Sequence, residues 1–298
     1  MHIDSIALKA QKRLNLMMPL KFKLDRRSLE VMYTSFVLPT MEYANVVWGG
    51  TYDSDLCKLE KIHVEGMRLI TGATAQSNIA KLYEDTGFCS FKSRCEYSML
   101  VMMYKMKHNM TPTYLNDLLP PENQEFIAYN LRNREDVSLV PTRLDSFKRS
   151  FLPTAIRLWN KLKIEDRHSA NILSFKSNLK RVNEETNVLY YYGQRWAAVH
   201  HARLRIGCSK LKYDLCFNLH VIGEPKCGCG ANLEDADHFF LFCPNYDDIR
   251  VSLYESVPDK NYFDIHTILY GSHDLSEAAN KEVFKAVHKY ITDSKRFT

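Results

Sequence analysis

The sequence has no long apolar run, since no stretch approaches the roughly 20 residues that a helix needs to span a bilayer. The first thirty residues interrupt each apolar run with Lys, Arg or Asp, a pattern unlike that of a secretory signal peptide. We therefore expect an intracellular chain without a membrane partner. In that compartment thiols stay reduced, so that clustered cysteines favour a metal site over disulfides.

The sequence also lacks the motifs of several enzyme classes. It contains no glycine-rich phosphate loop and no nucleophile elbow. Tyr246, Asp247 and Asp248 resemble the paired aspartates of polymerases. However, Asn245 occupies the position of the required aromatic residue, and Pro244 lies where a hairpin strand should enter. We expect the two aspartates to cap a helix and not to be catalytic.

The charges are unevenly distributed along the chain, although the net charge is only +5. Residues 140–215 contain 15 Lys/Arg and 6 Asp/Glu, whereas residues 216–298 contain 8 and 13. A polyanion such as a nucleic acid would therefore meet the basic middle of the chain. A solvated face of Lys and Arg without any partner explains the same counts.

Apolar residues recur mostly with the period of a helix, and we predict a mainly α-helical protein. Gly72 and Gly207 suit helix ends, and Ser276 suits a helix start. A helix that begins near Leu24 is expected to stop at Pro39. Further helices are expected at residues 54–72, 90–109, 193–207 and 276–294.

Three of the eight cysteines and one histidine lie within the stretch CGCGANLEDADHFFLFC. Zn²⁺ in a structural site takes four nitrogen or sulfur ligands in a tetrahedron, and three cysteines with one histidine are a common set. We therefore predict a structural zinc site with the ligands Cys227, Cys229, His238 and Cys243. Because four protein ligands fill the coordination sphere, the ion would stabilise the fold and not catalyse a reaction. The alternative is that three free cysteines and a surface histidine share the stretch by chance.

The residues around these ligands fit such a site. Gly228 and Gly230 give the backbone freedom to turn sharply around the metal. Asp235 or Asp237 can accept the second ring N–H of His238, and the segment FFLF gives the small unit an apolar face. We interpret three nearby candidate ligands as two buried small residues and a helix-face histidine: Cys208, Cys216 and His220.

Five blocks of the sequence resemble, in the right order, the carboxyl-terminal part of jockey-like, LINE-type non-LTR retrotransposon reverse transcriptases. They are HIDSIALKAQKRLNLM, RSLEVMYTSFVLPTMEYANVVWGG, LEKIHVEGMRLITGA, HHARLRIGCSKLKYDLC and CGCGANLEDADHFFLFCP. In that family the catalytic palm is followed by a helical thumb, a basic linker and a Cys-Cys-His-Cys knuckle. The chain is similar only from the thumb onward. The resemblance therefore implies reverse transcription for the parent protein, whereas this chain lacks the palm aspartates.

The resemblance also implies an organisation for the chain. It predicts a thumb-like region at residues 1–120, a basic connector at 121–190, a basic helix with the zinc knuckle at 191–250, and a helical tail at 251–298. The four zinc ligands match those of the family's knuckle. Because the thumb would normally bury a face against the palm, some exposed apolar surface is expected.

The basic block and the aromatic residues next to it imply contacts with template RNA or target DNA, since aromatic rings among basic side chains suit base stacking. The chain would then act in a nuclear or cytoplasmic ribonucleoprotein. Two alternatives stay open: the chain is part of an active reverse transcriptase whose palm lies upstream or in another chain, or it is a protein-interaction scaffold with a structural zinc. The candidate nucleic-acid contacts are Arg195, Trp196, His201, Arg203, Arg205, Lys210 and Lys212.

Overall fold

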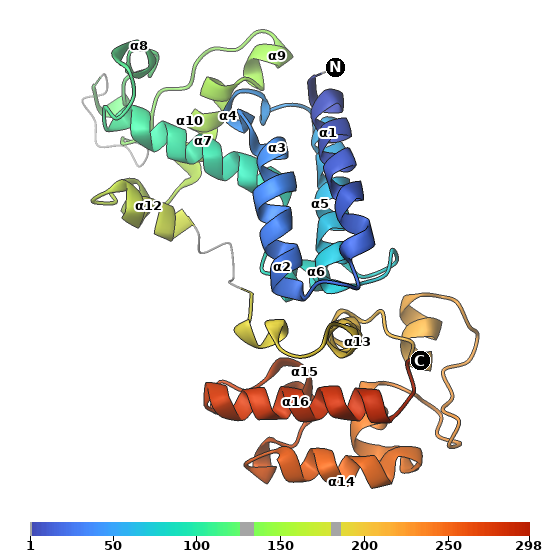
Figure 1. Cartoon of the computed structure of the whole chain (residues 1–298). Coiled ribbons are helices and arrows are strands. Elements are labelled where there is room, and N and C mark those ends of the chain that lie inside the picture. The colour runs from blue at the N-terminus through green and yellow to red at the C-terminus, as the bar shows by residue number, and fades with distance from the viewer. Residues whose placement is uncertain (1, 126–133, 180–185) are drawn as a thin grey trace. The chain divides into compact units, whose positions relative to one another are not determined.

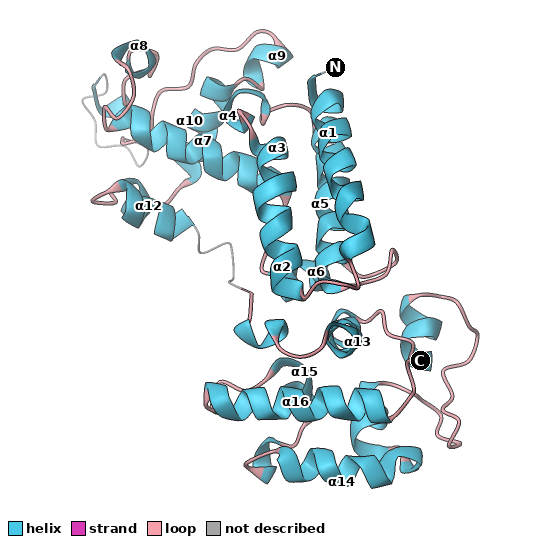
Figure 2. Ribbon diagram, in the orientation of Figure 1, coloured by secondary structure: helices cyan, strands magenta, loops and turns pink. Residues whose placement is uncertain are grey.

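The computed structural model describes residues 2–125, 134–179 and 186–298, and it is built of helices (Figures 1 and 2). The helical fraction is 66%, and no described residue belongs to a β-strand. The mainly α-helical class, with a Cys₃His stretch followed by a final long helix, is thereby confirmed. None of the described helices combines the length and the apolar character that a membrane span requires.

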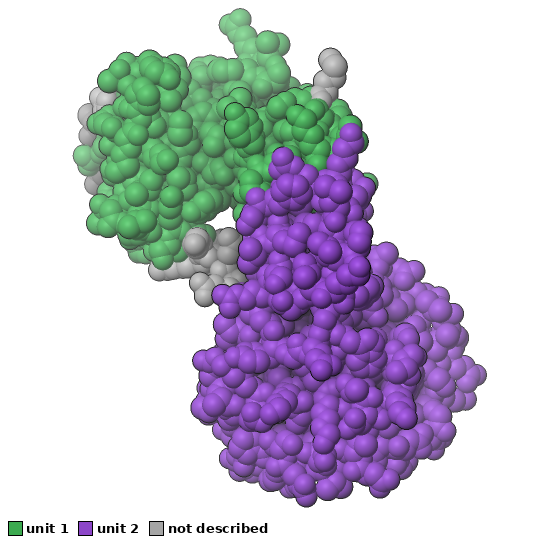
Figure 3. Space-filling view, viewed as in Figure 1, with its two compact units in different colours: residues 1–10, 38–63, 89–184 green, residues 11–37, 64–88, 185–298 purple. Residues whose placement is uncertain are grey.

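The contacts within the chain define two compact units, which Figure 3 colours separately. Unit 1 comprises residues 1–10, 38–63 and 89–184, and unit 2 comprises residues 11–37, 64–88 and 185–298. Helices α1 (His2–Met17) and α5 (Asp53–Thr71) contribute residues to both units. The predicted division at residues 120, 190 and 250 does not coincide with these units, because residues 11–37 and 64–88 pack with the last third of the chain.

Unit 1 is organised around a long methionine-rich helix, α7, which packs against α4, α10 and α12. Tyr104 of α7 stacks on Phe175 of α12 with ring centroids 4.4 Å apart, and Trp159 of α10 lies 5.7 Å from the same ring. Met99 and Met103 are buried in this core, as expected of adaptable packing residues. Besides parts of α1 and α5, the helices of unit 1 are α3 (Leu38–Glu42), α4 (Asn45–Trp48), α7 (Phe91–Lys107), α8 (Thr113–Asn116), α9 (Asp145–Lys148), α10 (Phe151–Lys161), α11 (Ile164–Arg167) and α12 (Ile172–Leu179).

Unit 2 is organised around α13, which packs against α6 and also against α15 and α16. Eight of the twelve residues of α13 are buried, so the predicted basic helix is largely a core element. Helix α14 packs along α16 and completes the core on the other side (Figure 1). Besides parts of α1 and α5, the α-helices of unit 2 are α2 (Arg26–Met32), α6 (Ile79–Thr86), α13 (Arg195–Ile206), α14 (Asp247–Ser256), α15 (Ile265–Tyr270) and α16 (Glu277–Asp293).

Local signals set the ends of the long helices as predicted. Gly72 follows α5 and Gly207 follows α13, and both have positive φ angles, 78° and 74°, which glycine adopts at low cost. The Ser276 side chain accepts a hydrogen bond from the Ala279 N–H at 3.2 Å and caps α16. These three helix ends are confirmed.

The prediction that Pro39 stops a helix is wrong. Pro39 lies inside α3, and the preceding residues Tyr33–Val37 form a π-helical turn that continues α2. A proline in a regular helix clashes with the carbonyl group four residues earlier. A π turn contains one additional residue and moves that carbonyl group away, so that the chain stays helical through the proline.

Candidate metal centre and the surrounding basic residues

The four predicted metal ligands converge in unit 2. The ligand atoms of Cys227, Cys229, His238 and Cys243 all lie within 4.8 Å of one another. The sulfur atoms of Cys227 and Cys243 are 3.7 Å apart, and Cys229 Sγ lies 3.2 Å from His238 Nε2. A tetrahedral ion with Zn–S bonds of about 2.3 Å holds two thiolates about 3.8 Å apart. The cluster can therefore hold a metal ion, and its donor set suits zinc.

A tight turn brings Cys227 and Cys229 together. The Cys227 N–H donates to Ala231 O at 2.9 Å, and the Gly230 N–H donates to Cys227 O at 3.2 Å. Gly230 has a φ of +98°, which favours glycine. Gly228 is not among the residues with positive φ. The conformational freedom predicted for both glycines is therefore used only at Gly230.

This difference predicts unequal effects of two matched variants. A Cβ atom would meet no atom within 4 Å at either Gly228 or Gly230, so the variants differ in backbone strain and not in steric fit. We expect Gly230→Ala to weaken zinc binding about 5- to 30-fold, the equivalent of roughly 1–2 kcal/mol for a side chain at positive φ. Gly228→Ala should bind zinc as the wild type does. Competition with a chromophoric chelator measures both affinities, and equal affinities would contradict the prediction.

The other two ligands are positioned by a π-helical turn, His238–Phe242. The Cys243 N–H donates to His238 O at 2.7 Å, which is an i→i+5 hydrogen bond. In a regular α-helix, residues five positions apart differ by about 140° around the axis. His238 and Cys243 would then face in different directions. The π turn brings both ligands to the same side.

The same turn places aromatic side chains in the core of unit 2. Phe239 and Phe240 are fully buried, whereas Phe242 is 68% exposed, so only part of the predicted apolar face FFLF is covered. The Phe239 ring lies 5.2 Å from the ring of Tyr290 and 5.4 Å from that of Phe297. The turn His238–Phe242 therefore both positions metal ligands and contributes two side chains to the core.

Two arginines anchor the segment from outside it. Arg250 of α14 donates to Phe240 O at 2.8 Å and also to Cys243 O. Arg296 donates to both carboxylate oxygens of the buried Glu234, at 2.7 and 2.8 Å. Sequence reasoning missed the pair of Glu234 and Arg296 because the two residues are 62 positions apart and no local pattern connects them.

Asp235 stabilises the ligand segment differently from the prediction. Its carboxylate accepts a hydrogen bond from the backbone N–H of His238 at 2.8 Å, so it fixes the start of the π turn. Asp237 is exposed. The three substitute ligands considered above do not belong to the cluster. Cys208 is buried, Cys216 lies in another π turn (Asp214–Asn218), and His220 has a φ of +54° outside the helices.

The thiols of the cluster differ in acidity before any metal binds. Burial raises the pKa of Cys243 to about 12. By contrast, hydrogen bonding with the backbone of Ala231 lowers the pKa of Cys229. Because a bound thiolate must lose its proton, the charge of a divalent ion has to offset the burial of Cys243. Metal binding at this cluster is therefore coupled to proton release.

Two of the seven candidate nucleic-acid contacts are buried. His201 is 1% exposed, and its Nε2 lies 3.0 Å from the carbonyl oxygen of Ile268. Arg205 is 4% exposed, its Nε donates to Asp85 at 2.6 Å, and the ring of Tyr190 covers its guanidinium group at 3.8 Å. Neither side chain therefore has surface to offer a ligand in this structure.

Arg195 and Arg203 are half-buried and bind the carboxyl end of α5. Arg195 donates to Leu69 O and Ile70 O at 3.0 and 2.6 Å, and Arg203 donates to Gly72 O at 2.9 Å. Cations are favourable there because carbonyl groups point out of the helix. In the described part of the chain, neither the two arginines nor Lys21 forms an ion pair. Burial and the positive charges of Arg203 and Arg195 lower the pKa of Lys21. The three side chains form a cluster of like charges.

The other three candidate contacts remain accessible to different degrees. Trp196 is 40% exposed and Lys210 is exposed, whereas Lys212 is half-buried. The Lys210 ammonium group donates to Phe297 O at 2.9 Å. Two other cations of the predicted basic segment lie outside the described residues: Lys180 and Arg181.

A row of four rings connects α13 with the metal-binding turn. Trp196 lies 4.5 Å from His200, His200 stacks on Phe297 at 5.0 Å, and Phe297 lies 5.4 Å from Phe239. Phe239 directly follows the ligand His238. The exposed tryptophan is therefore held by the same core that holds the metal ligands.

Comparisons with known proteins identify no relative of this chain. No protein-family model matches the chain, and no curated protein or solved structure shows significant similarity to it.

Proposed function

We propose that this chain is a non-catalytic, nucleic-acid-binding fragment from the carboxyl-terminal part of a jockey-like non-LTR retrotransposon reverse transcriptase. The observation that carries the proposal is the convergence of Cys227, Cys229, His238 and Cys243 within 4.8 Å. This arrangement fits the knuckle that the five sequence blocks imply. Zinc at this cluster would have four protein ligands and no open position, so its role is structural.

Exposed and half-buried side chains on and around α13 support binding of a single strand. Trp196 offers a partly exposed ring for base stacking, and Lys210, Arg203 and Lys21 supply positive charge for phosphates. Phosphate contacts carry no sequence information, so we expect weak sequence preference. The zinc unit would keep the Trp196 ring in place through His200 and Phe297.

Fluorescence anisotropy with the zinc-loaded chain tests this function. The ligands are labelled single-stranded RNA, single-stranded DNA and duplex DNA, each titrated at several salt concentrations. Affinity for a single strand should fall with salt, with a slope of about −0.7 per phosphate contact. Trp196→Ala should weaken binding about 5- to 100-fold. Phe217→Ala, which removes a comparably exposed ring outside α13, is the control and should bind normally.

Two results would contradict the proposal: no affinity for any strand, or an affinity that does not respond to salt. An intact metal centre without nucleic-acid binding would favour the protein-interaction scaffold. The non-catalytic assignment has its own test, since a primer-extension assay on an RNA template should give no nucleotide incorporation.

A second candidate, a thumb that joins a palm from another chain, is favoured by exposed apolar side chains. Leu16, Phe22 and Val31 of unit 2 and Tyr43 and Val47 of unit 1 are all exposed. Scattered apolar residues are common on protein surfaces. If the chain extends a primer only after a palm fragment is added, this candidate is supported over the non-catalytic one.

A further inference from the structure

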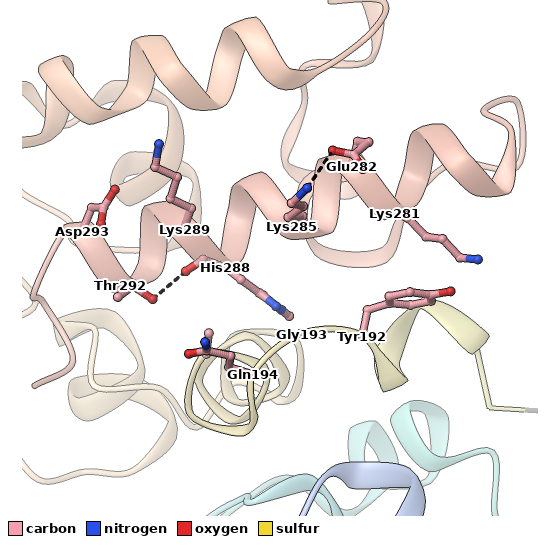
Figure 4. Close-up of a pocket in the computed structure, with 11 residues that line it drawn as sticks. Tyr192, Gly193, Gln194, Lys281, Glu282, Lys285, His288, Lys289, Thr292 and Asp293 are labelled. Atoms are coloured by element: carbon pink, nitrogen blue, oxygen red, sulfur yellow. Dashed lines mark hydrogen bonds and ion pairs between the residues drawn. The ribbon is translucent and has the colours of Figure 1, made fainter.

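Unit 2 contains a cavity of about 560 Å³ that the sequence did not indicate (Figure 4). One wall is the segment Tyr192–Ala197, which leads into α13, and the other is a face of α16. The volume lies within the range of about 300–1,000 Å³ that small-ligand sites have. The cavity is therefore large enough for a nucleobase with part of its sugar.

The α16 wall of the cavity carries three lysines on one face. Lys281, Lys285 and Lys289 follow one another at intervals of four residues, which on a helix is a step of about 6 Å. Lys281 pairs with Glu277 at 2.7 Å and Lys285 with Glu282 at 3.6 Å. Both acidic partners are exposed, so these pairs are weak. Lys289 forms no ion pair with any described residue, and the row favours a ligand with several negative charges.

The opposite wall contributes an aromatic ring and an amide. Tyr192 is 39% exposed, and the Lys281 ammonium group lies 4.7 Å from the centre of its ring. In Figure 4 the Lys281 side chain points toward this ring. Gln194 also lines the cavity, on the other side of Gly193 from Tyr192 in Figure 4, and its side chain does not cap α13. A ring for stacking and an amide thus line the same cavity as the lysines.

The floor of the cavity is a neutral histidine. His201 Nε2 lies 3.0 Å from Ile268 O, which can only accept, so His201 Nδ1 is the acceptor for His288 Nε2 at 3.2 Å. His288 Nδ1 is then an acceptor, and it has no hydrogen-bond partner. It points toward Gly193 in Figure 4, where a Cβ atom would lie only 2.0 Å away. Gly193 therefore allows the loop to approach the floor closely.

We propose that this cavity binds one nucleotide of a single-stranded nucleic acid, with its base stacked on Tyr192 and the flanking phosphates on Lys281, Lys285 and Lys289. The inference rests on the proposed function and names a site for it. The combination of ring, amide and aligned cations favours a nucleotide over an acidic peptide. RNA and DNA share this chemistry, and the experiment below separates them.

The test is a double-mutant cycle between protein and ligand. A labelled single strand of about 12 nucleotides, within the usual site sizes, is compared with the same strand carrying abasic sugars, as RNA and as DNA. Tyr192→Ala in the full zinc-loaded chain should weaken binding of the normal strand about 5- to 100-fold. Binding of the abasic strand should not change, because its phosphates remain and its bases are missing. Lys289→Gln should reduce the magnitude of the salt slope by about 0.7, the value of one phosphate contact in a single strand.

The matched control is Tyr254→Ala. Tyr254 is 43% exposed in the same unit, and the Lys260 ammonium group lies 4.5 Å from its ring, so the pair resembles Tyr192 and Lys281. Circular dichroism and zinc content verify that each variant is folded. If the wild type binds strands and Tyr192→Ala binds them equally well, the nucleotide site is refuted while the proposed function stands. If the wild type binds no strand, the proposed function fails as well. Tighter binding of an acidic peptide than of the strand would also overturn the assignment.

Discussion

Replacing Cys243 with serine is expected to abolish stoichiometric zinc binding and to unfold the core around α14 and α16. The Cys243 sulfur lies 3.7 Å from that of Cys227, and its N–H closes the π turn that holds Phe239 and Phe240 in the core. Structural zinc contributes an apparent free energy of about 10–16 kcal/mol in small zinc domains. Whole proteins have a net stability of only about 5–15 kcal/mol. Loss of the ion should therefore dominate the stability of unit 2.

Thermal unfolding followed by circular dichroism, with and without a chelator, measures this effect. Metal content is determined on the same samples under reducing conditions. Cys216→Ser is the control, since Cys216 is half-buried in unit 2 and does not belong to the cluster. The control should retain zinc and the wild-type unfolding midpoint. A Cys243→Ser protein with an unchanged midpoint would show that the core of unit 2 does not depend on the ion.

Asp85→Asn is expected to lower the free energy of unfolding by about 3–5 kcal/mol, the usual cost of removing one partner from a buried ion pair. One oxygen of the Asp85 carboxylate accepts from Arg26 Nη1 and the other from Arg205 Nε, both at 2.6 Å, and all three side chains are buried. Burial alone would raise the pKa of Asp85, but the guanidinium groups of Arg205 and Arg26 outweigh it and hold the pKa below its ordinary value. An asparagine of nearly the same shape would leave two buried cations without an anion.

Chemical denaturation measures the free energy of unfolding of Asp85→Asn, and Asp53→Asn is the control. Asp53 pairs with Lys92 at 3.0 Å on the exposed surface of unit 1, so its replacement should leave the unfolding midpoint where it is. The contact of Arg205 with the Tyr190 ring persists in the Asp85 variant. If Asp85→Asn unfolds at the wild-type midpoint, that ring and the neighbouring carbonyl groups suffice to hold the arginines.

The sequence predicted the long helices well because their signals are local. The ends at Gly72 and Gly207 depend on the conformational freedom of one residue, and the start at Ser276 depends on a hydrogen bond to a residue three positions on. The metal ligands were also predictable, since all four lie within seventeen residues and only a few metals suit their donor set. Such signals can be read without knowledge of the tertiary structure.

Features that depend on distant residues were not predictable. Arg205 is an ordinary basic residue in the sequence, and its burial follows from Asp85, which is 120 positions away. The π turn at His238 places two ligands and two core phenylalanines at once, and no local signal in the sequence indicated it. The continuation of the helix through Pro39 likewise depends on the π turn before it. Charge patterns alone therefore overestimated how much of α13 faces a ligand.

The row of rings from Trp196 to Phe239 gives the molecule a built-in optical probe. The indole lies against His200, and two further ring contacts lead from there to the residue after His238. Any displacement of the coordinating turn must shift this stack and alter the surroundings of the indole. Two other tryptophans, Trp48 and Trp159, belong to unit 1, so a change in emission on loading of the coordination sphere is assigned to the Trp196 indole.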